Sequence, residues 1–348
     1  MLISFGGLLA DLVVSVDAVP ERGADTLARG FSQTLGGGFA VVAAAARLGM
    51  PTALAGVLGS DPIADAARRA LREEGIELLF PEPRAGSSGV CLVLVDAGGE
   101  RTMVTVQGVE SMVQSEDFDA LAPGPGDVVY VNGYELLYPH AAGLVDWVRR
   151  VRPDHLVFDP GPLIAKIDAA ALGAVLDATR WLSLNAAEAT ALTGEDDPAA
   201  AATAALGRLA ADPPPPVDSP PPAHPVRQRS APGGDEPTSG HAARTPALPG
   251  GAGAASVGVV VRMGAEGCVV VERGEEPVSV PAFPAEAIDT TGAGDTHVGA
   301  FVAALARGLD PVEACRWANA AAAHVVASHG QVSPPRLDEL RALLERAP

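Results

Sequence analysis

Cysteine is scarce in this chain of 348 residues. Its three cysteines, Cys91, Cys268 and Cys315, are odd in number and far apart in the sequence. Each lies in an apolar run, which favours buried thiols over disulfides, a zinc site or a catalytic nucleophile. Such cysteine usage fits a reducing compartment, so we expect the protein in the cytoplasm.

Basic residues are also few. The chain has 24 Lys and Arg against 43 Asp and Glu, a formal net charge of −19 at pH 7. A surface of this sign repels nucleic acids and anionic lipids, so neither nucleic acid nor a membrane is expected as a partner. Residues 1–16 are apolar but lack a basic start and contain Asp11. They predict a first buried strand rather than a signal peptide or a membrane span.

Several familiar phosphate-binding motifs are missing. The chain contains no G-x-x-x-x-G-K-[ST] loop and no H-R-D or D-F-G element. Its GGGFAV segment, residues 36–41, departs from G-x-G-x-x-G spacing. The seven histidines show no metal-ligand spacing with each other or with the cysteines. These absences argue against a Walker-type loop, a dinucleotide-binding turn and a protein-kinase domain.

Short apolar runs alternate with helical patterns along most of the sequence, and 48% of the residues are hydrophobic. Strands are predicted at 2–16, 52–58, 128–131, 156–158, 181–184, 257–261 and 267–271. Helices are predicted at 38–48, 63–74, 140–151 and 168–178, and from 296 to the end. The alternation is typical of βαβ units, so we expect an α/β fold with a central, mostly parallel sheet.

Two further segments depart from this alternation. Residues 90–95 and 101–106, separated by DAGGE, predict a β-hairpin. Residues 211–256 contain 12 prolines and no Phe, Tyr or Trp. That composition cannot bury enough apolar surface to offset the entropy of ordering, so we expect a disordered insertion. A proline-rich ligand motif is the alternative, although the segment has no PxxP with flanking basic residues.

The segment 289–301, DTTGAGDTHVGAF, places small residues and one acid at the start of an apolar helix. Gly292, Ala293 and Gly294 let backbone N–H groups approach a ligand closely, and a helix start favours negative charge. Asp295 would repel an anion that is merely bound. It suits a base that accepts a proton from a hydroxyl while the amides stabilise a transferring phosphoryl group. An acidic cap on a glycine-rich turn is the structural alternative.

This segment resembles the C-terminal signature of the ribokinase family, the phosphofructokinase-B (PfkB) group of carbohydrate kinases. Residues 36–38 followed by 43–49 (GGG and AAAARLG) resemble that family's N-terminal glycine signature, and NAAE at 185–188 resembles its N-x-x-E motif. The three motifs occur in the family's order and cover nearly the whole chain. The resemblance implies one kinase domain over 1–348, a three-layer α/β/α sandwich with a small β lid near 12–35 and 88–108.

By this resemblance, Asn185 and Glu188 organise Mg²⁺, its waters and the phosphates of ATP, Glu188 acting on the metal through water. Read without the resemblance, the pair is a helix cap with a Glu three residues on, and both interpretations are compatible. Asp289 and Thr291 belong to a loop that holds a monovalent cation such as K⁺ in some relatives. The resemblance therefore implies ATP, Mg²⁺ and a K⁺ site.

Further residues match the family's nucleotide side. Arg262, Gly264 and Gly267 lie in RMGAEG, which resembles the turn that faces the nucleotide, although any turn between two strands has this composition. Asn319 matches a residue that lies near the adenine, although a polar residue on an apolar helix is also often a satisfied core amide. His297 stands where relatives usually have an aromatic residue, and we interpret it as a packing variant.

The sugar side both matches the family and departs from it. Asp11 resembles the acid that contacts substrate hydroxyls, and an acid inside an apolar run needs such a reason because unpaired burial is costly. Gly36 and Gly37 would let the backbone approach the sugar. The Asn that normally follows these glycines is absent, and Ala40 or Val41 takes its place, depending on the register. This loss leaves the identity of the sugar open.

Together these features predict ATP-dependent phosphorylation of a hydroxyl on a sugar or sugar-like small molecule. A nucleoside kinase of the same fold is an alternative, although aromatic residues for stacking a base make up only 4% of the chain. A degenerate kinase that binds a sugar or nucleotide as a sensor is another, although a binder needs no catalytic base. Relatives often pair through the lid, which predicts a homodimer.

Overall fold

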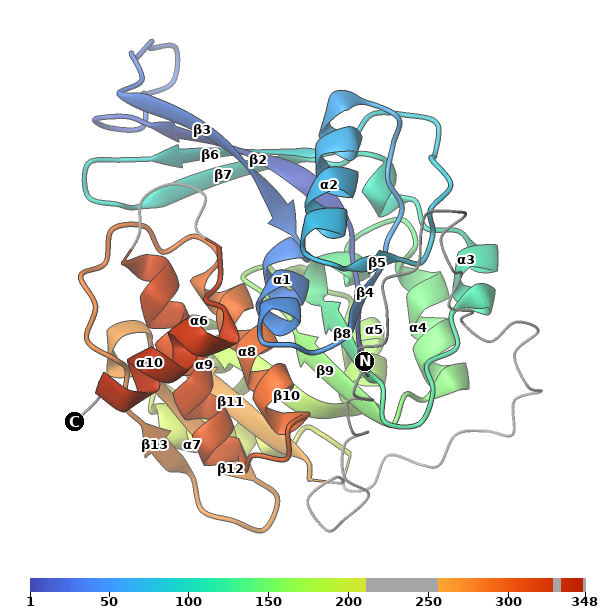
Figure 1. The fold of residues 1–348 in the computed structure, drawn as a ribbon, viewed down its shortest axis with the longest axis vertical. Coiled ribbons are helices and arrows are strands. Elements are labelled where there is room, and N and C mark those ends of the chain that lie inside the picture. The colour runs from blue at the N-terminus through green and yellow to red at the C-terminus, as the bar shows by residue number, and fades with distance from the viewer. Residues whose placement is uncertain (211–255, 328–332, 347–348) are drawn as a thin grey trace, which may run out of the picture.

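The computed structural model describes residues 1–210, 256–327 and 333–346 (Figure 1). The proline-rich segment 211–256 lies outside the described residues except for its last position. In the described ranges, no helix is both long enough and apolar enough to cross a membrane.

A large sheet forms the centre of the molecule, with the strand order β13-β12-β11-β10-β9-β8-β1-β4-β5. Neighbouring strands from β11 to β5 run parallel, whereas β12 and β13 are antiparallel additions at one edge. This arrangement confirms the mostly parallel sheet predicted from the sequence. The strands are β1 (Leu2–Phe5), β4 (Thr52–Ala55), β5 (Glu77–Leu78), β8 (Val128–Asn132), β9 (His155–Asp159), β10 (Thr179–Asn185), β11 (Gly258–Arg262), β12 (Cys268–Glu272) and β13 (Val278–Val280).

Helices cover both faces of the large sheet (Figure 1). Successive strand residues point to opposite faces, so Leu182 packs with Trp147 and the helices of one layer, whereas Trp181 packs with Phe301 and the other layer. The first layer contains α3 (Ser115–Ala120), α4 (Ala141–Val151), α5 (Ala169–Leu176), α6 (Ala186–Thr193) and α7 (Pro198–Leu206). The second contains α1 (Phe39–Arg47), α2 (Pro62–Glu73), α8 (Ala293–Leu305), α9 (Pro311–Val326) and α10 (Leu337–Arg346).

A second sheet of four strands, here called the small sheet, lies above one end of the large sheet (Figure 1). Its order is β3-β2-β6-β7, formed by β2 (Leu8–Ser15), β3 (Gly30–Gly37), β6 (Val90–Val95) and β7 (Arg101–Val106). The predicted hairpin at 90–106 is confirmed. The single strand predicted for residues 2–16 is wrong, because the chain leaves the large sheet at Gly6 and Gly7 and enters the small sheet with β2.

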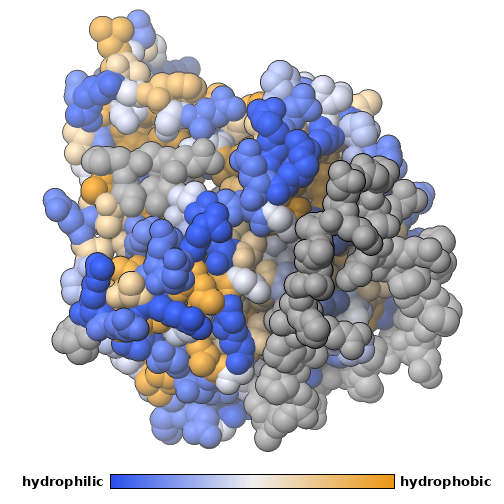
Figure 2. Space-filling view, in the orientation of Figure 1, coloured by the Kyte–Doolittle hydropathy of each residue, from blue (hydrophilic) through white to orange (hydrophobic). Residues whose placement is uncertain are grey.

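The two faces of the small sheet differ in chemistry. Asp11 pairs with Thr34 on β3 and with Cys91 on β6, and paired residues share a face. The opposite face carries four exposed apolar side chains, Phe31, Leu92, Val104 and Val106, which are between 39% and 67% exposed. Figure 2 shows apolar atoms gathered over the small sheet at the upper left.

Polar residues stand at the carboxyl ends of neighbouring strands in the large sheet. The register pairs Asn132 with Asp159, and Asn185 with Arg262. The strand order changes direction at β1, which has β8 on one side and β4 on the other. Ligands of open α/β sheets bind outside the carboxyl ends of the strands near such a switch point, so this edge is where a site is expected.

Candidate active site

Asp295 lies in the first turn of α8. Gly292 precedes the helix with a positive φ of 74°, a conformation that favours glycine. The Ala293 amide donates to the carbonyl of Thr290 at 3.3 Å, which closes the turn. Gly294 and Asp295 follow in the first helical turn, where backbone amides have no acceptor within the helix. The carboxylate and the amides predicted to form the site are thus held by one rigid turn.

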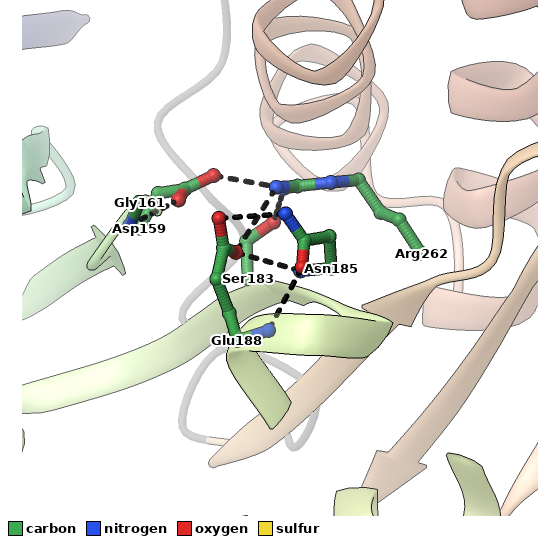
Figure 3. Close-up of polar contacts among 6 residues, drawn as sticks. All are labelled: Asp159, Gly161, Ser183, Asn185, Glu188 and Arg262. Atoms are coloured by element: carbon green, nitrogen blue, oxygen red, sulfur yellow. Dashed lines mark hydrogen bonds and ion pairs between the residues drawn. The ribbon is translucent and has the colours of Figure 1, made fainter. Parts of the chain in front are cut away.

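Arg262, at the end of β11, connects the end of β9 to a residue inside β10 (Figure 3). Its Nη1 donates to Asp159 Oδ2 at 2.8 Å and to the hydroxyl of Ser183, and its Nη2 lies 3.7 Å from Glu188 Oε2. The guanidinium also faces α8, because a Cβ built on Gly294 would lie 3.7 Å from Arg262 Nε. The arginine therefore lies between the acids of the sheet edge and the first turn of α8.

Asn185 and Glu188 form a complete capping box at the start of α6 (Figure 3). The Glu188 amide donates to Asn185 Oδ1 at 2.8 Å, and the Asn185 amide donates to Glu188 Oε2 at 2.7 Å. The Asn185 side-chain amide donates to Glu188 Oε1, also at 2.7 Å. The helix-cap interpretation is confirmed, and it fixes the Glu188 carboxylate at the same edge as Asp159.

Burial raises the pKa of three carboxylates in this region, those of Asp11, Glu188 and Asp295. Burial and then the charge of Asp159 raise the pKa of Asp295 to about 7, and the same two causes raise the pKa of Glu188 to about 7. Burial also raises the pKa of Asp11 to about 6. Burial alone would lower the pKa of Arg262, but the charges of Asp159 and Glu188 outweigh it and raise this pKa.

Asp11 and the two glycines predicted to lie beside the sugar, Gly36 and Gly37, come from neighbouring strands of the small sheet. A Cβ at Gly36 would lie 2.4 Å from Asp11 Oδ2, so only glycine leaves room for this carboxylate. Gly37 has a positive φ of 71°. Val41 is fully buried. Ala40 lines a neighbouring pocket that also contains Thr34 and Thr291, and its Cβ lies 3.7 Å from the Cβ that a side chain at Gly292 would have. Of the two positions at which the sequence lacks the expected Asn, only position 40 therefore has a side chain that is not fully buried.

The small sheet and the loop after β8 bring two residues to the cleft that the sequence analysis missed. Arg101 Nη1 donates to Thr291 Oγ1 at 3.5 Å, and its charge opposes the raised pKa of both Asp11 and Asp295. Tyr134 lies close enough to Asp295 and Asp11 for their charges to contribute to its raised pKa, of which burial is the largest cause. Neither residue belongs to a motif, so only the tertiary arrangement identifies them.

Asp159 and Ser183 were missed as well, although a signal existed. Asp159 follows the apolar run predicted as the strand 156–158, in the same position relative to its strand as Asn185. Polar residues at the carboxyl ends of parallel strands gather at one edge, which would have justified including it. Ser183 points into the same cluster from inside β10, and nothing in the sequence distinguishes it from a core serine.

The remaining predicted nucleotide residues have well-defined structural partners. Gly267, with a φ of 95°, ends the turn between β11 and β12, and a Cβ there would lie 2.1 Å from the carbonyl of Val280. Asn319 is buried, donates to the carbonyls of Val280 and Pro281 at 3.0 and 3.1 Å, and lies 3.1 Å from His297 Nε2 through its Oδ1. Gly264 opens the same turn with a φ of 60°. These residues shape the backbone on this side of the site.

The candidate metal ligands fit Mg²⁺ better than a metal held by protein alone. Within the described part of the chain, no group of three or more His, Cys, Asp or Glu side chains is placed to hold a metal. Protein-bound Mg²⁺ commonly uses one or two carboxylates together with substrate phosphates and water, and Asp159 and Glu188 supply two carboxylates. In the loop before α8, the Thr291 amide donates to Asp289 Oδ1 at 2.9 Å.

The carboxylate at a helix start, the paired acids and arginine at the sheet edge, and this sheet topology define the class of sugar kinases with a ribokinase-like fold. The chain belongs to the pfkB family of carbohydrate kinases, whose model matches residues 1–212 and 249–337. It is 28% identical over 342 residues to the uncharacterized sugar kinase YegV of Escherichia coli, covering 96% of this chain and 91% of that one. It is 26% identical over 345 residues to the ribokinase of Bacillus subtilis, covering 97% of both.

Solved structures confirm the fold. The chain superimposes on ribokinase from Thermotoga maritima with a TM-score of 0.72 at 22% identity, covering 99% of both chains. Arabidopsis thaliana ribokinase complexed with ribose and ATP gives 0.67 at 21% identity, again covering 99% of both. The nucleoside kinase of Methanocaldococcus jannaschii gives 0.69 at 18% identity, covering 99% of this chain and 98% of that one.

Proposed function

We propose that the protein transfers the γ-phosphoryl group of Mg-ATP to a hydroxyl of a sugar or sugar-like small molecule. The observation that carries this proposal is the position of Asp295, whose carboxylate stands in the first turn of α8 beside the Gly294 amide and near the guanidinium of Arg262. A base, backbone donors and a cation are the groups that phosphoryl transfer to an alcohol requires.

In the proposed reaction the acceptor hydroxyl gives its proton to the Asp295 carboxylate. The acceptor oxygen forms a bond to the γ-phosphorus, the bond from that phosphorus to the bridging oxygen breaks, and ADP leaves. Asp295, with a pKa of about 7, has a driving force for proton transfer that a carboxylate with an ordinary pKa lacks. The amides of Gly294 and its neighbours in the first turn stabilise the charge on the transferring group.

On the phosphate side, Arg262 offers positive charge to the transferring group, and Asp159 and Ser183 hold its guanidinium in place. Asp159 and Glu188 would hold Mg²⁺, Glu188 through water, with Asn185 fixing the Glu188 carboxylate. When bound, the metal would neutralise charge on the phosphates. The backbone around Gly264, Gly267 and Asn319 would shape the nucleotide pocket, and Asp289 and Thr291 remain candidates for the K⁺ site.

On the acceptor side, Asp11 would bind sugar hydroxyls beside the backbone of Gly36 and Gly37. The small sheet would act as the lid, since Asp11 and Arg101 both project from it toward the α8 turn. Closure would exclude water from the reacting groups and bring the Arg101 charge to the junction of acceptor and nucleotide.

The apolar outer face of the small sheet supports a homodimer through the lid. Phe31, Leu92, Val104 and Val106 are exposed on the face opposite Asp11, and exposed apolar patches of this kind mark interaction sites. Val104→Glu should convert the dimer to a monomer in light scattering coupled to size exclusion. A wild-type protein that is monomeric at all concentrations would refute the pairing.

The direct test is ADP release from Mg-ATP over a panel of sugars, sugar phosphates and nucleosides, with Asp295→Asn measured beside the wild type. Loss of a general base reduces turnover by roughly 10²–10⁴-fold, so the variant should be nearly inactive on the acceptor that the wild type prefers. Turnover confined to nucleosides would make the protein a nucleoside kinase. ATP binding without turnover on any acceptor would favour the sensor.

A further inference from the structure

The chain passes between the large sheet and the small sheet four times, and a glycine lies at each crossing. Gly7 separates β1 from β2, Gly37 ends β3, Gly89 precedes β6 and Gly108 follows β7. None of the four positions has room for a side chain. A Cβ would lie 2.3 Å from Glu110 Cβ at Gly7, 2.2 Å from the Gly7 carbonyl oxygen at Gly37, 2.0 Å from Glu110 Oε1 at Gly89 and 2.2 Å from the Gly89 nitrogen at Gly108.

One buried side chain connects these crossings. Glu110, in the short helix Val109–Ser111, is only 1% exposed. Its Oε2 accepts the Gly89 amide at 2.8 Å and its Oε1 accepts the Gly108 amide at 2.7 Å, while its Cβ packs on Gly7. The remaining crossing, at Gly37, is linked to the crossing at Gly7, because the Gly7 carbonyl accepts the amide of Gly38 at 3.3 Å.

A second buried acid holds the same point from the side of the large sheet. Glu135 Oε1 accepts the Gly7 amide at 3.3 Å, and its Oε2 lies 2.8 Å from His140 Nε2. Buried carboxylates are costly unless hydrogen bonds satisfy them. Two buried acids that bond backbone amides at the crossings indicate that the backbone geometry there is tightly held, since apolar side chains would bury surface without this cost.

We propose that Glu110 is a positioning residue that sets the orientation of the small sheet over the cleft, an inference that rests on the proposed kinase function. Its carboxylate joins the start of β6 to the end of β7, so the small sheet turns as one body about the four glycines. Asp11 and Arg101 then reach the α8 turn together. Without this link the four strands would stay paired, but the angle of the small sheet over the cleft would no longer be fixed at Gly89 and Gly108, and the acceptor would be held less well than the nucleotide.

Glu110→Gln tests the inference because it keeps the shape of the side chain. Its amide oxygen still accepts one backbone N–H, but its NH₂ group meets the other donor, so one of the two bonds is lost. The KM for the acceptor should rise about tenfold while the KM for ATP changes less than about twofold. ATP hydrolysis without acceptor should increase relative to transfer. Hydrogen exchange at β6 and β7 in the ligand-free protein should accelerate.

Asp117→Asn is the matched control, since Asp117 is also a buried acid, accepting the Gln114 amide at 2.9 Å and pairing with Arg84. It should lower stability without changing the ratio of the two KM values or the exchange at β6 and β7. If Glu110→Gln behaves in the same way, Glu110 is only structural and the inference is overturned.

Glu110→Asp, which keeps the charge, should show the same changes to a smaller extent if the glutamine variant folds poorly. The hydrogen-exchange measurement needs no turnover. A wild type without kinase activity would therefore refute the proposed function, while unchanged exchange in both Glu110 variants would refute the role of Glu110.

Discussion

The guanidinium of Arg262 donates to the carboxylate of Asp159 at 2.8 Å, although 103 residues separate them in the sequence. The contact joins the carboxyl ends of two strands that are not neighbours in the sheet, since β10 lies between β9 and β11. The negative charge of Asp159 contributes to the raised pKa of Glu188 and of Asp295. A residue outside every recognised motif thus influences both the proposed metal ligand and the proposed base.

Asp159→Asn should therefore change the pH dependence as well as the rate. The substitution keeps the shape but removes a charge that raises the pKa of Asp295 and Glu188, so both groups should ionise at lower pH. We expect turnover to fall about tenfold, the Mg²⁺ concentration for half-maximal rate to rise, and the acid limb of the pH–rate profile to move to lower pH. Steady-state kinetics at several pH values and Mg²⁺ concentrations would measure all three.

Ser183→Ala is the control for this prediction. It removes a hydrogen-bond acceptor of Arg262 without removing a charge, so its acid limb should coincide with that of the wild type. An acid limb that stays in place in Asp159→Asn would contradict the electrostatic role of Asp159.

The activity of the wild type should rise with pH and level off above about 7. A general base must be unprotonated, and burial followed by the charge of Asp159 raises the pKa of Asp295 to about 7. Glu188 titrates in the same range, and its protonation should weaken metal binding. At saturating Mg²⁺, the fall of kcat/KM on the acid side should therefore reflect the protonation of Asp295 alone. At limiting Mg²⁺, the protonation of Glu188 should add to it, and the fall should become steeper. A flat profile between pH 5.5 and 8 would exclude Asp295 as the base, since a base with a pKa of about 7 predicts a rise of about 30-fold over this whole range.

The sequence predicted the mostly parallel sheet because its apolar runs have the right lengths and alternate with helical periods, whereas the three-layer arrangement came from the family resemblance. The strands at 128–131, 181–184 and 257–261 were placed within two residues of their bounds. β3 was not predicted as a strand, because GFSQTLGG has no run of apolar residues and the strand is held by its pairing with β2. The long strand predicted at 2–16 failed because period alone cannot show where a chain changes sheets. Gly6 and Gly7 were the available signal for that break.

In the candidate site, too, some residues could be predicted from the sequence and others could not. Asp295, Asn185 and Glu188 belong to local motifs in which a few neighbouring residues determine the geometry, so sequence sufficed to propose them. Arg101 reaches Thr291 across 190 residues, and its position depends on how the small sheet packs. No short-range pattern encodes that contact.

Asp295→Asn should stabilise the ligand-free protein at high pH. The pKa of Asp295 is raised from 3.8 to about 7, so the folded state binds this proton more tightly than the unfolded state. That contribution to stability is fully present below about pH 4 and is lost as the pH rises through 7. Asparagine avoids the buried charge altogether. Discounted for partial solvent access, the gain at pH 8 is about 1–2 kcal/mol, or roughly 2–6 °C in Tm, with little gain at pH 4.

Thermal unfolding followed by circular dichroism at pH 4 and pH 8 would measure this difference. A variant that is less stable than the wild type at both values, or stabilised equally at both, would show that the Asp295 carboxylate is not strained by burial. The substitution would then act through packing alone.

Ala40→Asn should change which acceptor the enzyme prefers. Ala40 lies beside Gly292 and is one of the two positions, 40 and 41, where the family resemblance leads us to expect an Asn that contacts sugar hydroxyls. A buried amide that finds a hydroxyl partner favours that substrate, whereas one left unpaired is penalised. We expect kcat/KM for ribose to rise relative to the wild type's preferred acceptor by about tenfold, with the KM for ATP unchanged.

Ala46→Asn, on the same helix but away from the cleft, introduces the same residue at the same helix propensity and should leave the ratio as it is. If both variants shift the ratio equally, or neither does, position 40 does not select the acceptor, and Asp11, Arg101 and Tyr134 become the residues to test for specificity.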